Sequence, residues 1–580
     1  QNGNRYATQI CDLGIEWDPS GIYPCHLDRS GGCTYVCRLT QAGRAEAGRS
    51  RTNESKTRPR YCLLQPFLRP QQARLQPAIT AATPTLLRCW LSKPSSLILS
   101  DPCQKLDNQC FLLSMGWSLV QPARQHVTAL SLPDVPLQGS LSPHLGNLSF
   151  LSLLNLTSTG LSGSIRVELV ELEKLRRRRE TNSLGFNSLS GEIPVGLLQN
   201  MLNLQKFSVA RNELSGHIPP YLFNNTASLQ YITLVNNSLS GPIPYGIGSL
   251  VQYPQPSITC PGYKDYALQV TVSQDLFQTI KAFSLFRNNF GSQIPTGLAA
   301  CQYLEVLDLS LNYFVDVVPT WLSQLPHLTQ LSLGGNNLVG PIPVVLSNLT
   351  CPTALALLFN QLTDPIPSFL GNFSELTLLS LGSNQLSGSV PPAVGNIPSL
   401  IILSLLSNHL DGDLGFLFSL SKCRKLQLLE LSNNVFIGEF PDHIGNLSTD
   451  LLLFGTAYNK LTGRFPSTFS NLSNLQSLGL DSNLLTGGSI TGMHDLTWPY
   501  ISDNDLSVPI PTQIGMLRRL QRLCLGGNKL FGSIPDSTGN LTLLEYVILS
   551  DNQLSSSIPA SLFQLDKLSF SQFLCGFPPS

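Results

Sequence analysis

Residues 327–350 read HLTQLSLGGNNLVGPIPVVLSNLT, and residues 351–374 continue with CPTALALLFNQLTDPIPSFLGNFS. Both stretches follow the pattern L-x-x-L-x-L-x-x-N-x-L-x-G-x-I-P with few substitutions. The L-x-L alternation predicts a short strand that points both leucines to one side. A single unit of this size cannot bury its leucine face, so neighbouring units must stack to form a continuous core. The pattern therefore predicts a repeat solenoid with one parallel strand per unit.

The asparagine of this pattern recurs along the chain, mostly at steps of 24 or 25 residues. Val135 and Thr159 take the same place in two earlier units, and the 51-residue step from Asn237 to Asn288 contains one degraded unit. We expect about 18 units between residues 126 and 570. The repeated asparagines are Asn187, Asn212, Asn237, Asn288, Asn312, Asn336, Asn360, Asn384, Asn408, Asn434, Asn459, Asn483, Asn504, Asn528 and Asn552.

Each repeated asparagine follows the point where a strand ends and the chain turns inward. Its amide offers two donors and an acceptor, so it can pair with backbone groups of its own turn and of the neighbouring unit. We expect the series to form a buried ladder in which a lost member leaves backbone groups unpaired. The proline of G-x-I-P fits an irregular return segment, because it has a fixed φ and no N–H to donate to a sheet.

The composition argues against several classes of function. The 580 residues hold 36 Lys and Arg against 36 Asp and Glu, so no net charge attracts nucleic acid or an anionic membrane. No stretch reaches the roughly 18 apolar residues of a membrane span, and the start QNGNRYATQICDLG has no secretory leader. We interpret the sequence as a fragment or an imperfect gene prediction.

Motifs for catalysis, cofactors and metals were not found. The chain has no Gly-rich phosphate loop with a strand lysine, no H-R-D and no D-F-G, so we expect no catalytic residues and no cofactor. The spacing of His26 with Cys25, Cys33 and Cys37 matches no structural zinc pattern. Cys301 and Cys423 occupy the central position of an L-x-x-C-x-x-L pattern that points into the core. We expect both to be buried and outside any disulfide.

Ten N-x-S/T sequons are present, which is typical of a chain that passes through the secretory pathway. Six of them recur at the end of a unit, in G/S-N-L/F-S/T, and one repeated phase means one repeated surface. We expect glycosylation of a secretory-pathway array, whose sugars would offset a charged content of only 12%. The recurrent sites are Asn147, Asn348, Asn372, Asn446, Asn471 and Asn540, and the others are Asn53, Asn155, Asn224 and Asn236.

The repeats LSLGGNNLVGPIPVVLSNLT, LSLGSNQLSGSVPPAVGNIPSL and LCLGGNKLFGSIPDSTGNLTLL resemble the plant-type leucine-rich repeat. The first good units, VTALSLPDVPLQGSLSPHLGNLSFLSLLNLTSTGLSGSI, resemble the ectodomains of cereal receptor-like kinases, a group that includes immune receptors. The resemblance implies an α/β repeat solenoid, a leucine-rich-repeat superhelix with its parallel sheet on the concave face. It also implies an extracellular peptide or protein ligand, a leucine-rich-repeat co-receptor, and a membrane span and kinase that this chain lacks.

The resemblance also suggests how the chain is divided. Residues 1–100 share neither period nor composition with the rest, and we expect them to be disordered or spurious. Residues 101–125 resemble a degenerate N-terminal cap, in which Cys103 and Cys110 would form a disulfide. Residues 126–570 form the array, and FLCGFPPS at 571–580 resembles the start of a C-terminal cap. Arg176 to Arg179 stand where a strand should begin and are expected to disturb the sheet.

Solenoids of this kind bind partners on the long face formed by their strands. We expect ligand contacts from residues between or just after the strand leucines, which point outward, although each could equally be a solvated strand residue. The candidates are Arg211, Thr233, Arg287, Asp308, Ser332, Ser380, Ser404, Glu430, Asp481 and Asp503. No run of outward aromatic residues was identified among the repeats.

The leading hypothesis is the ligand-sensing ectodomain of a receptor-like kinase at the extracellular face of the plasma membrane. Two alternatives remain open at the level of sequence. One is a secreted inhibitor or decoy in the apoplast, and the other is the non-functional product of a decayed receptor gene, which the degraded units favour.

Overall fold

The computed structural model describes residues 26–27, 33–34, 129–244 with short gaps, and 279–568 except residue 556; the short gaps are 138, 149–150, 152, 172–179, 199–203, 221 and 223–227. The chain divides into two compact units, residues 1–87 and 88–580. In the first unit, β1 (His26–Leu27) and β2 (Cys33–Thr34) pair antiparallel. The predicted N-terminal cap with Cys103 and Cys110, and the predicted C-terminal cap at 571–580, lie outside the described residues.

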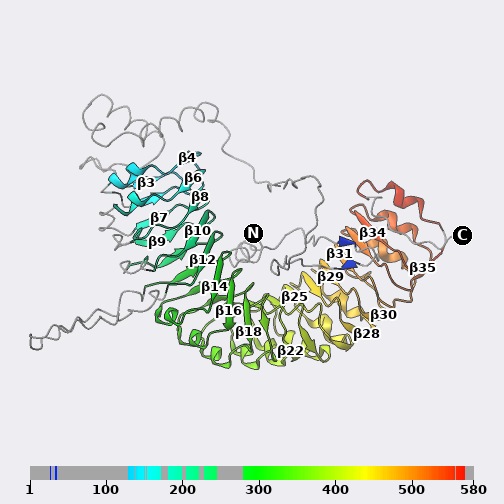
Figure 1. Ribbon diagram of the computed structural model, residues 1–580. Coiled ribbons are helices and arrows are strands. Elements are labelled where there is room, and N and C mark those ends of the chain that lie inside the picture. Colours follow the sequence, from blue (N-terminus) through cyan, green and yellow to red (C-terminus); the bar gives the residue numbers. More distant parts are fainter. Residues whose placement is uncertain are drawn as a thin grey trace, which may run out of the picture. The chain divides into compact units, whose positions relative to one another are not determined.

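In the second unit, each repeat contributes one short strand to a parallel sheet. Each strand pairs with those of the repeats before and after it, in chain order (Figure 1). The strands are β3 (Ala129–Ser131), β5 (Leu153–Asn155), β7 (Glu180–Ser183), β9 (Leu204–Ser208), β11 (Tyr231–Thr233), β13 (Ala282–Ser284), β15 (Val306–Asp308), β17 (Gln330–Ser332), β19 (Ala354–Ala356), β21 (Leu378–Ser380), β23 (Ile402–Ser404), β25 (Leu428–Glu430), β27 (Leu453–Gly455), β29 (Ser477–Gly479), β31 (Trp498–Tyr500), β32 (Arg522–Cys524) and β34 (Tyr546–Ile548).

The leucines of the L-x-L motif form the core, as predicted. In β17 and the residue after it, Leu331 and Leu333 are 2% and 0% exposed, whereas Gln330 points to the opposite side and is half-buried. The same alternation recurs from repeat to repeat, so the buried leucines stack along the array at the strand spacing of about 4.8 Å. We call the surface formed by the outward residues of these strands the strand face.

A hydrogen-bond ladder of asparagine side chains ties each repeat to the one before it. Asn336 Oδ1 accepts a bond from the Phe314 N–H at 3.0 Å, and its Nδ2 donates to the carbonyls of Leu309 at 3.1 Å and Leu333 at 2.9 Å. Corresponding bonds to the preceding repeat are made from Asn187 to Asn552, by every asparagine of the series named above. In the earlier unit, Thr159 donates its hydroxyl to the Leu156 carbonyl instead.

After the ladder residue, every described repeat except that of Asn504 adds a second short strand on the side of the array. Nine of these strands form one parallel sheet, which we call the lateral sheet. They are β4 (Gly139–Ser140), β6 (Leu161–Ser164), β8 (Ser188–Gly191), β10 (Glu213–His217), β12 (Ser238–Gly241), β14 (Asn289–Ser292), β16 (Tyr313–Val317), β18 (Asn337–Gly340) and β20 (Gln361–Leu362). Smaller sheets continue it with β22 (Ser387–Ser389) and β24 (His409–Asp411), then β26 (Ile437–Glu439), β28 (Lys460–Arg464) and β30 (Leu484–Gly487), then β33 (Phe531–Gly532) and β35 (Gln553–Leu554).

The return segments are mostly 3₁₀ helices that begin after the proline of the G-x-I-P motif. Pro343, for example, is the N-cap of η5 with φ −65°, the value that its ring imposes. The helices are η1 (Pro143–Asn147), η2 (Val167–Glu171), η3 (Thr296–Ala300), η4 (Thr320–Gln324), η5 (Val344–Asn348), η6 (Ser368–Asn372), η7 (Pro392–Asn396), η8 (Leu414–Phe416), α4 (Leu417–Leu420), η9 (Asp442–Asn446), η10 (Ser467–Asn471), η11 (Thr512–Met516), η12 (Asp536–Asn540) and η13 (Ala560–Gln564).

Two irregular regions interrupt the regular succession of repeats. Thr233 of β11 pairs directly with Ser284 of β13, so the degraded unit between Asn237 and Asn288 places no strand between them. The described residues therefore hold 17 stacked strands, one for each expected unit except the degraded one. The expected disturbance after Arg179 is a register shift between Glu180 and Thr181, and β7 still pairs with both neighbours.

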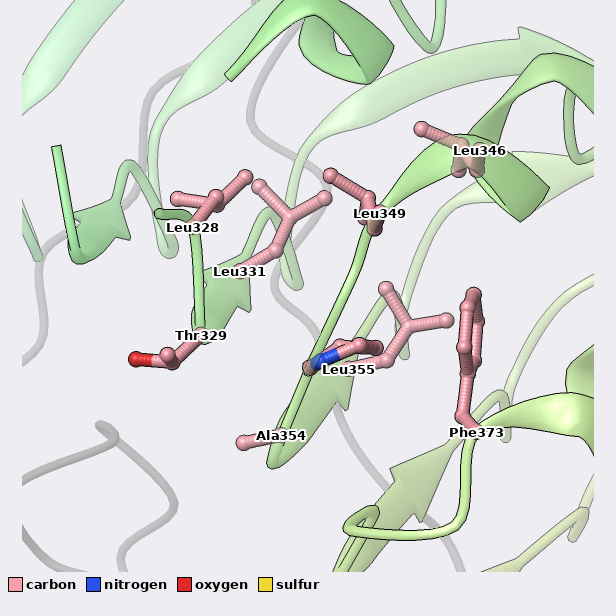
Figure 2. A pocket seen from close by; sticks show the side chains of 9 residues that line it. Leu328, Thr329, Leu331, Leu346, Leu349, Ala354, Leu355 and Phe373 are labelled. Atoms are coloured by element: carbon pink, nitrogen blue, oxygen red, sulfur yellow. The ribbon is translucent and has the colours of Figure 1, made fainter. Parts of the chain in front are cut away.

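The interior is closely packed. The cavity in Figure 2, lined by Leu331, Leu355 and Phe373 among other apolar side chains, has a volume of about 10 Å³, too small for a ligand. Cys301 and Cys423 are fully buried outside any disulfide, as predicted. Burial raises the pKa of the Cys301 thiol to about 12 and that of the Cys423 thiol to about 11. The cavity of Figure 2 therefore holds no ligand site.

We predict that Asn336→Ala lowers the free energy of local unfolding by about 3 kcal/mol, because it leaves the Phe314 N–H and two carbonyls in the core without a hydrogen-bond partner. Hydrogen exchange measured by mass spectrometry would show faster exchange in residues 309–340. The control is Asn337→Ala, which removes an exposed neighbour outside the ladder. Equal exchange in the two variants would contradict the structural role of the ladder.

Candidate ligand-binding face

The strand face consists of four rows of side chains that run along the array. In the repeat of β17 they are occupied by Gln330, Ser332, Gly334 and Gly335. The first three residues alternate with the buried leucines and therefore point outward. The fourth precedes the ladder asparagine and adopts a left-handed conformation, with φ +66° at Gly335. We call these the first, second, third and turn rows.

The ten predicted contact residues fall into three of these rows. Thr233, Asp308, Ser332, Ser380, Ser404 and Glu430 belong to the second row, and Asp481 belongs to the third. Arg211, Arg287 and Asp503 occupy the turn row, with φ of 54°, 55° and 53°. These three are exposed, while Thr233 and Glu430 are half-buried. The ten residues thus do not form one contiguous site.

Five of the ten candidates have little exposed surface, although they occupy outward positions of the strands. These five are buried: Asp308, Ser332, Ser380, Ser404 and Asp481. Their side chains are short and lie between strands that are only about 4.8 Å apart. Asp308 is used internally, because Oδ1 accepts from the Ser310 N–H at 3.1 Å and Oδ2 lies 3.2 Å from the Ser284 hydroxyl. Burial raises the pKa of its carboxyl to about 6, although the hydrogen bonds to Ser310 and Ser284 act to lower this pKa.

An aromatic and basic cluster occupies the C-terminal third of the strand face. Arg522 on β32 donates to the Tyr500 hydroxyl at 3.0 Å, and its guanidinium lies 4.8 Å from the centroid of the Tyr546 ring. Trp498 on β31 donates from Nε1 to Gln521 Oε1 at 3.2 Å. Trp, Tyr and Arg dominate the binding energy of protein interfaces. We call Trp498, Tyr500, Arg522 and Tyr546 the aromatic cluster.

The sequence analysis missed the aromatic cluster because one of its strands does not contain the leucine motif. Pro499 occupies the inward position of β31, so WPY does not match L-x-L. The phase of the ladder would have found it, since the first and second rows lie six and four residues before each ladder asparagine. Counting back from Asn504 gives Trp498 and Tyr500.

The N-terminal half of the strand face contains a smaller group of the same kind. Lys206 lies over the ring of Tyr231 at 4.8 Å from its centroid, and both residues belong to the first row. Next to the first row, Lys281 forms an ion pair with Glu305 at 2.7 Å. The hydrogen bond to Glu305 raises the pKa of the Lys281 ammonium. Among the described residues of the N-terminal half, the strand face has no Trp, and no Arg lies over a Tyr ring there.

The recurrent sequons lie away from the strand face. Asn348, Asn372, Asn446, Asn471 and Asn540 are all exposed, and each is the last residue of its 3₁₀ helix. Asn147 ends η1 in the same way. Asn155 is different, because it ends β5 on the strand face and its Oδ1 accepts from the Thr157 hydroxyl at 2.7 Å. Asn236 is half-buried in the turn row, and Asn53 and Asn224 lie outside the described residues.

The described part of the second unit shows neither a metal-binding cluster nor a membrane-spanning helix. Its His, Cys, Asp and Glu residues form no group of three or more that could hold a metal ion. None of the helices described for this chain has the length and apolar character of a membrane span.

Comparison with known proteins defines the class. The leucine-rich-repeat family model matches residues 279–338, and a second model of the same repeat matches residues 228–250, 375–397, 425–447, 519–541 and 543–565. The plant peptide hormone receptor RGFR1, solved in complex with RGF2, superposes with a TM-score of 0.62 at 30% identity. That superposition covers 78% of this chain and 70% of the receptor chain. The chain therefore belongs to the leucine-rich-repeat family, and the predicted solenoid with its parallel sheet is confirmed.

Two further relatives narrow the kind of leucine-rich-repeat protein. The receptor kinase HAESA of Arabidopsis, solved with the peptide hormone IDA and the co-receptor SERK1, superposes with a TM-score of 0.65 at 27% identity, covering 84% of this chain and 80% of that one. The receptor kinase-like protein Xa21 of Oryza sativa subsp. japonica is 43% identical over 68 residues. That match spans 12% of this chain and only 7% of Xa21. The predicted similarity to plant leucine-rich-repeat receptor ectodomains is thus confirmed.

We predict that the folded array becomes less stable as the pH rises from about 4 to about 7. Burial raises the pKa of Asp481 to about 7 and that of Asp308 to about 6, both from 3.8. The folded state therefore holds more protons than the unfolded state in this window, and stability is lost as the two carboxyls ionise. Melting temperatures measured across this pH range should fall with rising pH.

The matched control for this prediction is Asp308→Asn with Asp481→Asn, which keeps a side-chain oxygen for the Ser310 and Ser502 N–H groups but cannot ionise. Its melting temperature should depend less on pH than that of the wild type. A wild-type melting temperature that rises with pH, or an unchanged slope in the double variant, would refute the assignment.

Proposed function

We propose that this chain is the extracellular ligand-sensing ectodomain of a receptor-like kinase, which binds a peptide or protein on its strand face. The observation that carries the proposal is the aromatic cluster, because it gathers residue types of high binding energy on four adjacent outward positions. HAESA and RGFR1, which share the fold, are solved with peptide hormones. The cavity of Figure 2, which lies in the described core, is too small to hold a ligand.

The proposed receptor acts by bringing a second protein close. A ligand held on the strand face presents part of its own surface beside the array, and a co-receptor ectodomain binds both. Binding of the second partner then has a high effective concentration. The solved HAESA complex contains the co-receptor SERK1 as well as the peptide hormone IDA. The catalytic step would belong to a kinase domain at the inner side of the plasma membrane.

The glycan sites are consistent with this division of surfaces. The five exposed sequons at the ends of the 3₁₀ helices lie on the return segments, and their sugars would leave the strand face open. A glycosylated array also agrees with a location outside the cell.

We predict that Trp498→Ala or Arg522→Ala lowers the affinity for a ligand of the strand face by about 30-fold, the effect of a typical hot-spot residue. The full chain is secreted from plant cells, immobilised, and used to select binders from a displayed library of random peptides. Affinities are then measured by biolayer interferometry. Tyr313→Ala is the control, since Tyr313 is an exposed aromatic residue of the lateral sheet. Selected binders that tolerate both strand-face substitutions would refute the proposed site.

We predict glycan occupancy at Asn348, Asn372, Asn446, Asn471 and Asn540 in the secreted chain, because an exposed helix end gives the transferase access to the Asn side chain. Enzymatic deglycosylation in heavy-oxygen water converts each occupied Asn to a labelled Asp, which mass spectrometry detects. Asn155 should be largely unoccupied, since its amide oxygen already accepts two hydrogen bonds. Unmodified asparagines at all five sites would contradict the proposed extracellular location.

A further inference from the structure

We propose that the strand face carries a subsite for a basic side chain of the ligand, Lys or Arg, between Glu430, Gly455, Gly479 and Asp481. The inference rests on the proposed function, because it assigns a chemistry to one part of the proposed ligand face. The four residues come from β25, β27, β29 and the turn that follows β29.

Two glycines form the floor of the subsite. Gly455 and Gly479 occupy the second row of adjacent strands and are in register with each other. A Cβ on Gly455 would lie 2.4 Å from both carboxylate oxygens of Glu430. The Glu430 carboxylate therefore reaches from β25 onto β27, into space that only a glycine leaves open. A Cβ on Gly479 would meet nothing closer than the Gly455 Cα at 3.7 Å, so the floor continues across β29.

Asp481 forms one wall of the subsite. It lies two residues after Gly479 and so points to the same side of the sheet. Its Oδ1 accepts from the Ser502 N–H at 2.8 Å, but its Oδ2 is buried without a hydrogen-bond partner. The side chain is only 6% exposed. A buried carboxylate oxygen without a donor is costly, and a ligand that brings a donor removes this cost.

Neither carboxylate is neutralised by a cation of the described chain. The ion pairs there are Lys281 with Glu305, Arg519 with Asp495 and Lys529 with Asp505. The Glu430 Oε1 accepts from the Ser432 N–H at 3.0 Å, and the carboxylate also has hydrogen bonds with the Ser432 side chain and the Leu431 backbone, none of which brings a positive charge. Burial, the largest cause, raises the pKa of both carboxyls. A cation bound at this outward-facing floor favours the ionised form of both acids, so the floor is complementary to a positive charge.

The far end of the floor explains why the group should carry an aliphatic stem. Tyr500 is in register with Gly479, so its ring borders the glycines on the side opposite Glu430. Trp498 lies on the same strand in the first row. Lysine and arginine combine an apolar stem with a charged head, and aromatic rings attract their cations. Arg522 does not fill this place, since its guanidinium contacts the Tyr500 hydroxyl and the Tyr546 ring.

The test uses random peptides selected on the full, secreted chain. Binders are expected to share a Lys or Arg at one position, and its replacement by Gln should weaken binding by about 10-fold or more. The double variant Glu430→Gln, Asp481→Asn keeps the oxygens that cap Ser432 and Ser502 but removes both charges. It should weaken the basic peptides by a similar factor and leave the Gln peptides unchanged.

Controls separate this subsite from general attraction and from misfolding. Asp551→Asn removes an exposed acid of the same face and should have no such effect. Gly455→Ala, which displaces the Glu430 carboxylate, should weaken the same peptides, and melting curves verify that each variant is folded.

The outcomes distinguish this inference from the proposed function. Peptides that lose affinity with Trp498→Ala but not with the charge-removing double variant, or that show no preference for a basic residue, overturn the subsite alone. A complete absence of peptides that bind the strand face overturns the proposed function, and the subsite with it.

Discussion

The hydrogen bonds of the ladder asparagine are the interaction on which the rest of the structure depends. Each asparagine satisfies an N–H and a carbonyl of the preceding repeat, together with carbonyls of its own turn. These groups would otherwise be unpaired in an apolar core, because the chain leaves its strand there and no sheet bond is available. The side chain therefore fixes both the turn and the register of the next strand. Leucine burial supplies the driving force, but the asparagine decides where each repeat sits.

Fixed register turns a set of distant residues into continuous rows. Residues about 24 positions apart become neighbours at about 4.8 Å, and outward positions of successive repeats line up across the strand face. Tyr500, Arg522 and Tyr546 meet for this reason. The same geometry places the Glu430 carboxylate over Gly455. A binding surface on this fold is thus determined by the residues chosen for each row, while the scaffold beneath them stays the same.

The leucine and asparagine spacing was sufficient to predict the solenoid, its parallel sheet and the buried cysteines at 301 and 423. The individual surface residues were harder to predict. Spacing shows which way Asp308 points. It does not show that this side chain is buried and hydrogen-bonded to Ser284 of the preceding repeat and to Ser310 of its own repeat. Pro499 concealed the strand of Trp498 and Tyr500, because a proline at an inward position breaks the leucine pattern without breaking the sheet. The pairing of β11 with β13 across the degraded unit could not be anticipated either, since it depends on which units stack.

The central claim is that ligands bind the C-terminal third of the strand face. The most direct measurement is differential hydrogen exchange of the full, secreted chain with and without a saturating peptide binder. The account predicts that protection is confined to the strands from β25 to β34 and the turns that follow them. Protection centred on the 3₁₀ helices or on the lateral sheet, with the strand face unchanged, would contradict it.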